Sequence, residues 1–306
     1  ENKPLGPLTT FGIGGPARWY GEVSNADSLA QATDWAAKKN VPVFLLGGGS
    51  NILVADDGFA GLVIRLTHSS VTTQDATLVL GAGTPLLQAV QQSAYNSLSG
   101  LERLAGIPGS VGGAVRGNAG AFGTEIKDTV KHVRAIHRQS GEAALFSPDE
   151  CGFSYRHSFF KQNPEWVIME VALQLRPGDT ATLQKTIRET IARRNARQIQ
   201  DIQSAGSCFI NPVVPAENIR REFETEAQTQ CRGQRVPAGW LMDKAGLRGT
   251  QIGGAMFSSM HPNYCINANH ATAADVLALL RLARQRVADQ FGITLFLEIQ
   301  LVGLSL

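Results

Sequence analysis

The hydrophobic positions of the chain fall into short apolar runs separated by stretches of helical spacing. Val43 to Leu46 form one apolar run, three glycines interrupt it, and Ile52 to Val54 resume it. This order predicts two buried strands joined by a glycine loop. Similar runs predict further strands at 17–20, 62–66, 77–80, 133–137 and 166–175, and a short strand flanked by turn residues within 204–212.

Apolar residues three and four positions apart predict helices between these strands. Ser24 or Asn25 can cap the first helix, and Thr272 with Asp275 three residues later resembles a capping box. Strands that alternate with helices in this way predict an α/β organisation. The predicted helices span 25–39, 84 to just before Gly100, 180–197, 238–245 and 272–290.

The C-terminal end of the chain alternates between apolar and other residues over 294–302. Leu295, Leu297 and Ile299 face one side and Glu298 the other, which predicts a last strand that carries Glu298. The turn residues at 176–179 predict a domain boundary there. Residues 215–235 are polar and predict a surface excursion.

Composition and charge exclude several classes of function. The chain has 306 residues and a net charge of +2, which gives no reason to expect a nucleic-acid partner. The sequence holds no apolar span long enough for membrane insertion. Four distant cysteines without a C-x-x-C pair predict free thiols in a reducing compartment, and the scattered histidines predict no metal site.

The glycines cluster in loops, and two of these clusters predict ligand binding. Successive glycines at 47–49 let backbone N–H groups turn toward an anion such as a diphosphate, and Ser50 and Asn51 add donors. The pattern is neither a Rossmann fingerprint nor a P-loop. A tight turn between strands is the structural alternative. Residues 104–123 are also glycine-rich, and their interspersed apolar residues favour a loop moulded around a large ligand.

An ordered set of motifs carries a family resemblance along nearly the whole chain. The motifs are Gly47–Asn51, Gly106–Ser110 with Gly112–Ala114, Asn118–Gly120, Tyr155–Ser158, Ala205–Ser207 with Asn211–Pro212, Ala245–Gly249, and Glu298. Their order resembles the UDP-N-acetylenolpyruvoylglucosamine reductase family. That family makes UDP-N-acetylmuramate from UDP-N-acetylglucosamine enolpyruvate for peptidoglycan, with FAD as cofactor and NADPH as hydride donor.

The resemblance implies a fold and a set of ligand-binding residues. Residues 1–176 would form an FAD-binding domain of the vanillyl-alcohol-oxidase type with two subdomains, and 177–306 a C-terminal α+β substrate-binding domain. Tyr155, Arg156, Arg197 and Asn211 would contact the substrate. We expect a bacterial, cytoplasmic monomer with FAD held non-covalently. The implied FAD contacts are Thr10, Gly14, Gly47, Gly48, Gly49, Ser50, Asn51, Gly106, Ile107, Pro108, Gly109, Ser110, Gly112, Gly113, Ala114, Asn118, Ala119 and Gly120.

The resemblance also implies that Arg156, Ser207 and Glu298 are catalytic. An arginine fork matches the enolpyruvyl carboxylate, on which negative charge develops during reduction. A serine hydroxyl can give its proton to the resulting carbanion, and Glu298 can hydrogen-bond the enediolate if burial keeps it protonated. Each residue also has a structural reading: a turn for Ser207, an ion pair for Arg156 and a solvated strand position for Glu298.

The chain departs from the family pattern at some positions. Ile210 stands where the family usually has Lys, which removes a positive charge near the serine. No Tyr occurs between Lys161 and Ser207, so the chain resembles the shorter subclass that lacks a tyrosine-bearing loop. Two other functions stay open at this point, a flavin oxidase of the same fold and a catalytically silent flavin- or nucleotide-sugar-binding protein.

Overall fold

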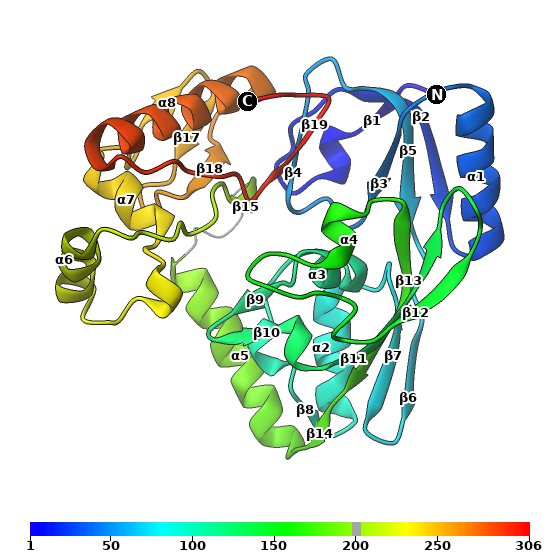
Figure 1. The fold of residues 1–306 in the computed structure, drawn as a ribbon. Coiled ribbons are helices and arrows are strands. Elements are labelled where there is room, and N and C mark those ends of the chain that lie inside the picture. Colours follow the sequence, from blue (N-terminus) through cyan, green and yellow to red (C-terminus); the bar gives the residue numbers. More distant parts are fainter. Residues whose placement is uncertain (198–202) are drawn as a thin grey trace. The chain divides into compact units, whose positions relative to one another are not determined.

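The computed structural model describes residues 1–197 and 203–306, and its mixture of helices and sheets agrees with the predicted α/β and α+β character (Figure 1). The chain forms two compact units. Unit 1 comprises residues 1–3, 17–48 and 60–196, and unit 2 comprises residues 4–16, 49–59 and 197–306. The domain boundary predicted at 176/177 stays a prediction. No helix in the described ranges is long and apolar enough to cross a bilayer.

The first part of unit 1 is a small sheet with one helix. Helix α1 (Ala26–Lys38) begins where it was predicted, because the Asn25 side chain accepts a hydrogen bond from Ser28 N and Ser28 Oγ closes the capping box. Leu29 and Ile64 lie in the core beneath the helix. The sheet order is β1 (Lys3–Pro4), β2 (Pro16–Val23), β5 (Phe59–Leu66) and β3 (Val43–Leu46).

The second part of unit 1 is an antiparallel sheet that shares a core with three helices. Its strand order is β12 (Ala143–Phe146), β11 (Val130–His137), β13 (Trp166–Gln174), β7 (Thr77–Gly81) and β6 (Val71–Gln74). Strands β6 and β12 were not predicted. Residues from all three helices are buried in one cluster with the sheet. The helices are α2 (Leu86–Tyr95), α3 (Val111–Arg116) and α5 (Thr180–Arg197).

Short elements complete unit 1. They are β8 (Leu98–Ser99) paired with β14 (Arg176–Pro177), β9 (Gly120–Ala121) paired with β10 (Thr124–Glu125), helix α4 (Phe159–Gln162), and the 3-10 turns 102–104 and 126–128.

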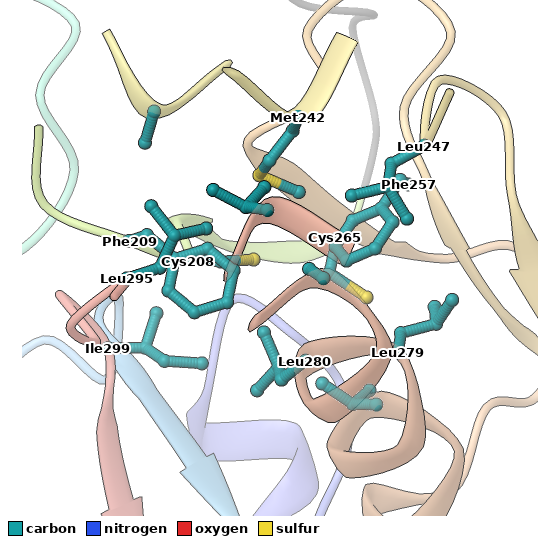
Figure 2. Packing of buried hydrophobic residues seen from close by; sticks show 14 of the residues in the cluster. Cys208, Phe209, Met242, Leu247, Phe257, Cys265, Leu279, Leu280, Leu295 and Ile299 are labelled. Carbon is teal, nitrogen blue, oxygen red and sulfur yellow. The ribbon is translucent and has the colours of Figure 1, made fainter. Parts of the chain in front are cut away.

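Unit 2 packs a four-stranded sheet, a two-stranded sheet and three helices around its own hydrophobic core. Figure 2 shows this core, in which Cys208, Phe209 and Leu295 lie near residues of α8. Strand β4 (Ile52–Val54) pairs in parallel with β19 (Gln300–Val302). The sheet order is β15 (Ser204–Ser207), β18 (Tyr264–Asn267), β17 (Ala255–Phe257) and β16 (Gln251–Ile252); the helices are α6 (Glu217–Ala227), α7 (Ala238–Lys244) and α8 (Ala273–Phe291).

Two predictions for unit 2 need correction. The strand predicted at 294–302 is limited to β19, and Glu298 lies just before it in a bend. The segment changes partners, because Leu297 forms a bridge with Phe209 whereas β19 pairs with β4. The polar excursion predicted at 215–235 contains helix α6, which is amphipathic and buries Ile219 and Phe223 four residues apart.

Candidate functional site

The two predicted glycine loops are in direct backbone contact within unit 1. A Cβ added to Gly48 would lie 2.5 Å from Gly109 Cα, and one added to Gly47 would lie 2.9 Å from Ser110 Oγ. Gly109 itself has φ +112°, a conformation that side chains rarely tolerate. A Cβ is therefore excluded at Gly48, where the two backbones meet. This backbone-lined arrangement fits the close approach that a diphosphate requires.

The predicted cofactor residues 112–114 form the first turn of α3. Ser110 caps this helix, and its Oγ accepts a hydrogen bond from Gly113 N at 3.3 Å. Gly109 O accepts from Leu86 N at 2.9 Å, which ties the loop to the start of α2. The loop is thus held at a fixed place between two helices.

The Asn118 side chain forms two hydrogen bonds to the backbone of unit 1. Its side chain is fully buried, its Nδ2 donates to Ser154 O at 2.9 Å, and its Oδ1 accepts from Lys127 N at 3.3 Å. Two residues later, Gly120 O accepts from Arg156 Nη2 at 3.2 Å. The predicted cofactor segment 118–120 therefore supports the turn that carries Arg156.

Arg156 sits at the tip of a tight turn in an unusual conformation. Ser154 and His157 exchange backbone hydrogen bonds of 3.1 Å, and Arg156 has φ +57°. Lys161 Nζ holds the turn by donating to Arg156 O at 3.0 Å. The guanidinium carbon lies 5.3 Å from the centre of the Tyr155 ring. A left-handed non-glycine residue is costly, and such strain is common where function fixes a side chain.

Ser207 ends a strand that is interrupted by a bulge. Ser204 pairs with Ile266 and Ser207 with Tyr264, and Gly206 between them has φ +79°. Ser207 is half-buried, whereas Cys208 is only 2% exposed and packs in the core (Figure 2). Burial raises the pKa of the Cys208 thiol to about 12. The two side chains therefore have different environments, as alternation along a strand predicts.

The structure brings Glu298 onto the segment next to Ser207, although the two are far apart in the sequence. Glu298 N donates to Cys208 O at 2.8 Å, and Ile210 N donates to Phe296 O at 3.0 Å. Glu298 is half-buried. Two of the three predicted catalytic residues thus lie on hydrogen-bonded neighbouring segments of unit 2. Arg156 belongs to unit 1.

Asn51 and Thr10 connect the glycine loop to these segments within unit 2. Asn51 Nδ2 donates to Glu298 O at 3.0 Å, and its own O accepts from Gln300 N at 2.9 Å. Thr10 Oγ1 donates to Ser204 O at 2.7 Å, and Thr10 N donates to Gly49 O at 3.1 Å. Both residues were predicted to contact FAD. Their backbone or side-chain bonds also fix where the Ser207 and Glu298 segments lie.

Of the other two predicted substrate residues, Asn211 has a structural contact and Arg197 has a side chain that is not described. Asn211 Oδ1 accepts from Ala238 N at 3.0 Å and so caps helix α7. Arg197 ends helix α5, and its side chain lies outside the described part of the chain. On the same helix, the Arg193 guanidinium carbon lies 5.4 Å from the centre of the Phe122 ring, and Arg194 packs against Gly106. Arg193 and Arg194 of α5 therefore contact the second glycine-rich segment, residues 104–123.

Sequence reasoning missed two polar residues that hold the predicted catalytic ones. Lys161 lies in the segment that carries the Arg156 motif, so its nearness in sequence was a usable signal. Asn263 binds the backbone N–H and C=O of Phe209 through its side chain. No pattern in the sequence marks Asn263, because side-chain bonds to a distant backbone leave no periodicity.

Comparison with known proteins gives matches to both halves of the chain. Residues 19–145 match the FAD binding domain family, and residues 197–302 match the C-terminal domain of UDP-N-acetylenolpyruvoylglucosamine reductase. These matches confirm the predicted fold class, an FAD-binding domain of the vanillyl-alcohol-oxidase type followed by a C-terminal domain.

Similar whole proteins cover almost the full chain. The UDP-N-acetylenolpyruvoylglucosamine reductase of Carboxydothermus hydrogenoformans is 37% identical over 305 residues, which are 99% of this chain and 93% of the relative. That of Paracoccus denitrificans is 38% identical over 304 residues, with 99% and 95% covered. The crystal structure of UDP-N-acetylenolpyruvylglucosamine reductase (MurB) from Thermus caldophilus matches with a TM-score of 0.77 at 34% identity, covering 99% of this chain and 98% of that one.

Proposed function

Because the chain belongs to the UDP-N-acetylenolpyruvoylglucosamine reductase family, we propose that it reduces UDP-N-acetylglucosamine enolpyruvate to UDP-N-acetylmuramate with NADPH. Family membership makes it an FAD-dependent oxidoreductase of peptidoglycan precursor synthesis. The observation that carries the proposal is the placement of Ser207 and Glu298 on hydrogen-bonded neighbouring segments. Neither a silent binding protein nor an oxidase needs a residue that donates a proton to a substrate carbon.

The glycine loops are the proposed holders of FAD. The side-chain-free contact between Gly48 and Gly109 supports this, since backbone N–H groups can approach a diphosphate there. Bound FAD would supply hydride transfer from NADPH to the terminal carbon of the enolpyruvyl group. The protein's own residues then have to bind the carboxylate, stabilise the charge that develops and deliver one proton.

Arg156 is the proposed carboxylate ligand. Its turn is fixed by Lys161 and by the backbone pairing of Ser154 with His157, and its Nη2 donates to Gly120 O, so the guanidinium starts from a defined position. A planar fork binds a carboxylate in two-pronged geometry and stabilises negative charge as it spreads from the neighbouring carbon. A pre-fixed donor costs little reorganisation when the charge appears.

Ser207 is the proposed proton donor, and Glu298 in its protonated form the proposed hydrogen-bond donor to the enediolate. Ser207 is half-buried at the end of its strand, so the hydroxyl is not sealed in the core as the Cys208 thiol is. A serine hydroxyl is a weak acid, but the carbanion is a strong base, so transfer is feasible when donor and carbon are held close. The proton leaves Ser207 Oγ and bonds to the carbon next to the carboxylate, the one that does not receive the hydride.

Finer assignments belong to the same proposal. We place the chain in the shorter subclass, supported by the lack of any tyrosine between Lys161 and Ser207 in the sequence. Similarity to bacterial relatives supports the bacterial cytoplasm as the place of action. The monomeric state stays a prediction.

The test is to identify the product and count the NADPH consumed. The purified protein is incubated without oxygen with NADPH and UDP-N-acetylglucosamine enolpyruvate, and the nucleotide sugar is analysed by mass spectrometry. We expect its mass to rise by two hydrogens, with one NADPH oxidised for each product formed. NADPH oxidation without any change in the nucleotide sugar would contradict the proposal.

A further inference from the structure

We propose that Asn263 is a positioning residue for the reaction, which holds the backbone that carries Ser207 and is joined to Glu298. Asn263 directly precedes strand β18 and is not part of any motif noted in the sequence. The inference rests on the proposed role of Ser207 as the proton donor. It adds the residue that fixes where that donor lies.

The regular pairing of β15 with β18 stops at the proposed donor. Ser207 and Tyr264 form the last pair of the ladder, after a bulge at Gly206. Beyond this pair, Asn263 takes over the hydrogen bonds that a further pair would have made. Its O accepts from Cys208 N at 2.7 Å, its Oδ1 accepts from Phe209 N at 2.9 Å, and its Nδ2 donates to Phe209 O at 2.8 Å.

Because these groups are buried, loss of the Asn263 hydrogen bonds would leave polar atoms without a partner. Asn263 is 3% exposed, and the two residues that it binds, Cys208 and Phe209, are 2% and 0% exposed and packed in the hydrophobic core of Figure 2. Buried backbone groups need partners, because water cannot replace a lost bond there. A side-chain amide offers one donor and one acceptor close together, which is what the N–H and C=O of a single residue require.

The opposite edge of residues 208–210 is hydrogen-bonded to the segment that carries Glu298, the second proposed acid. Glu298 N donates to Cys208 O at 2.8 Å, and Ile210 N donates to Phe296 O at 3.0 Å. Residues 208–210 are thus bound by Asn263 on one edge and by 296–298 on the other. A shift of this segment would move Ser207, which is covalently attached to it, and would disturb the bond that orients Glu298.

Two substitutions remove the side-chain hydrogen bonds between Asn263 and Phe209 to different degrees. Asn263→Ala leaves Phe209 N and O without the amide, and Asn263→Ser is a milder change whose hydroxyl is too short to serve both groups. Asn267→Ala is the matched control at the other end of β18. There Asn267 Oδ1 accepts from Ala271 N at 2.7 Å and Nδ2 donates to Gln203 Oε1 at 3.0 Å, away from residues 208–210.

Stopped-flow spectroscopy of the flavin in the whole protein separates the two half-reactions. Reduction by NADPH needs no proton at the substrate carbon, so it should stay within about twofold of the unmodified protein. Reoxidation by UDP-N-acetylglucosamine enolpyruvate should slow by roughly 10- to 100-fold in Asn263→Ala and by less in Asn263→Ser, since a displacement of about 1 Å can cost 100-fold. The Asn267→Ala variant should leave both rates nearly unchanged.

Amide hydrogen exchange gives a readout that does not depend on turnover. The Phe209 amide should lose protection in both Asn263 variants and keep it in Asn267→Ala. Should Asn263→Ala fail to fold, Asn263→Ser provides the same comparisons.

Ser207→Ala, measured in parallel, distinguishes the possible failures. If it slows reoxidation while both Asn263 variants do not, the positioning role is wrong and the proposed function stands. If the Asn263 variants slow both half-reactions equally, as a general loss of structure would, the positioning role is also wrong. If Ser207→Ala leaves reoxidation unchanged, Ser207 is not the donor, and the inference falls together with that part of the proposed function.

Discussion

The contact between the glycine loops predicts that one methyl group at Gly48 weakens FAD binding. In Gly48→Ala the new Cβ would lie 2.5 Å from Gly109 Cα and 3.1 Å from Ser110 N, which are backbone atoms that cannot rotate away. Ordinary contact begins at 3.4 Å, so the two loops must separate by about 1 Å. The substitution thus acts on the place where the diphosphate is proposed to bind.

The size of the effect follows from this separation. Overpacking of this kind costs roughly 1–3 kcal/mol of folding free energy. A hydrogen bond to a charged group contributes about 1.5–3 kcal/mol, and about 1.4 kcal/mol corresponds to a tenfold change in Kd. If the shift removes one N–H···phosphate bond, the Kd for FAD should rise roughly 10- to 150-fold.

The assay is a titration of apoprotein with FAD, followed by flavin fluorescence. Because we expect non-covalent attachment, acid treatment should release FAD and allow the apoprotein to be prepared. Gly117→Ala is the matched control, since its Cβ would be 3.5 Å from Gly113 O and it has no positive φ. We expect the control to bind FAD like the unmodified protein. Equal FAD affinity for Gly48→Ala and Gly117→Ala would refute the assignment of the loops to the diphosphate.

Two further predictions concern the proposed proton donor and its neighbour. Ser207→Ala should leave FAD binding and NADPH oxidation nearly unchanged but slow reoxidation by the enolpyruvyl substrate, and a loss below about tenfold would be too small for general acid catalysis. Ser207→Cys should recover part of the rate, because a thiol is a stronger acid, and loss of turnover in Cys208→Ala but not Ser207→Ala would move the role to Cys208. Burial raises the pKa of Cys208 to about 12 and that of Cys265 well above its usual value, so both should stay protonated at pH 8. Thiol reagents should label them there only after unfolding, and rapid labelling in the native protein would contradict their burial.

Much of the secondary structure could be predicted because local patterns determine it. Helix α8 begins at Thr272 as its capping box indicates, and the apolar runs on both sides of the first glycine loop are strands β3 and β4. The pattern could not show that β3 pairs with β5 and β4 with β19 in different sheets. Pairing depends on residues far apart in the sequence, which leave no periodic signal.

In the candidate site, too, local patterns could be predicted from the sequence and long-range contacts could not. The motifs marked Ser207 and Glu298 as candidates, which stay predictions, and the regular strand predicted around Glu298 is interrupted where the chain changes partners between Leu297 and Gln300. The segments that carry the candidate residues are held by hydrogen bonds between side chains and backbone, such as those of Asn263 and Lys161. An isolated polar residue in the sequence does not reveal which backbone group it will bind.

The most direct test of the central claim compares two oxidants of the reduced flavin. The protein is reduced with NADPH without oxygen and mixed in a stopped-flow instrument with either UDP-N-acetylglucosamine enolpyruvate or dissolved oxygen, while the flavin absorbance is recorded. The account predicts that the enolpyruvyl substrate restores the oxidised spectrum at least about 100-fold faster, the scale on which positioned acid catalysis acts. Reoxidation by oxygen at the same rate or faster would contradict it and would favour an oxidase.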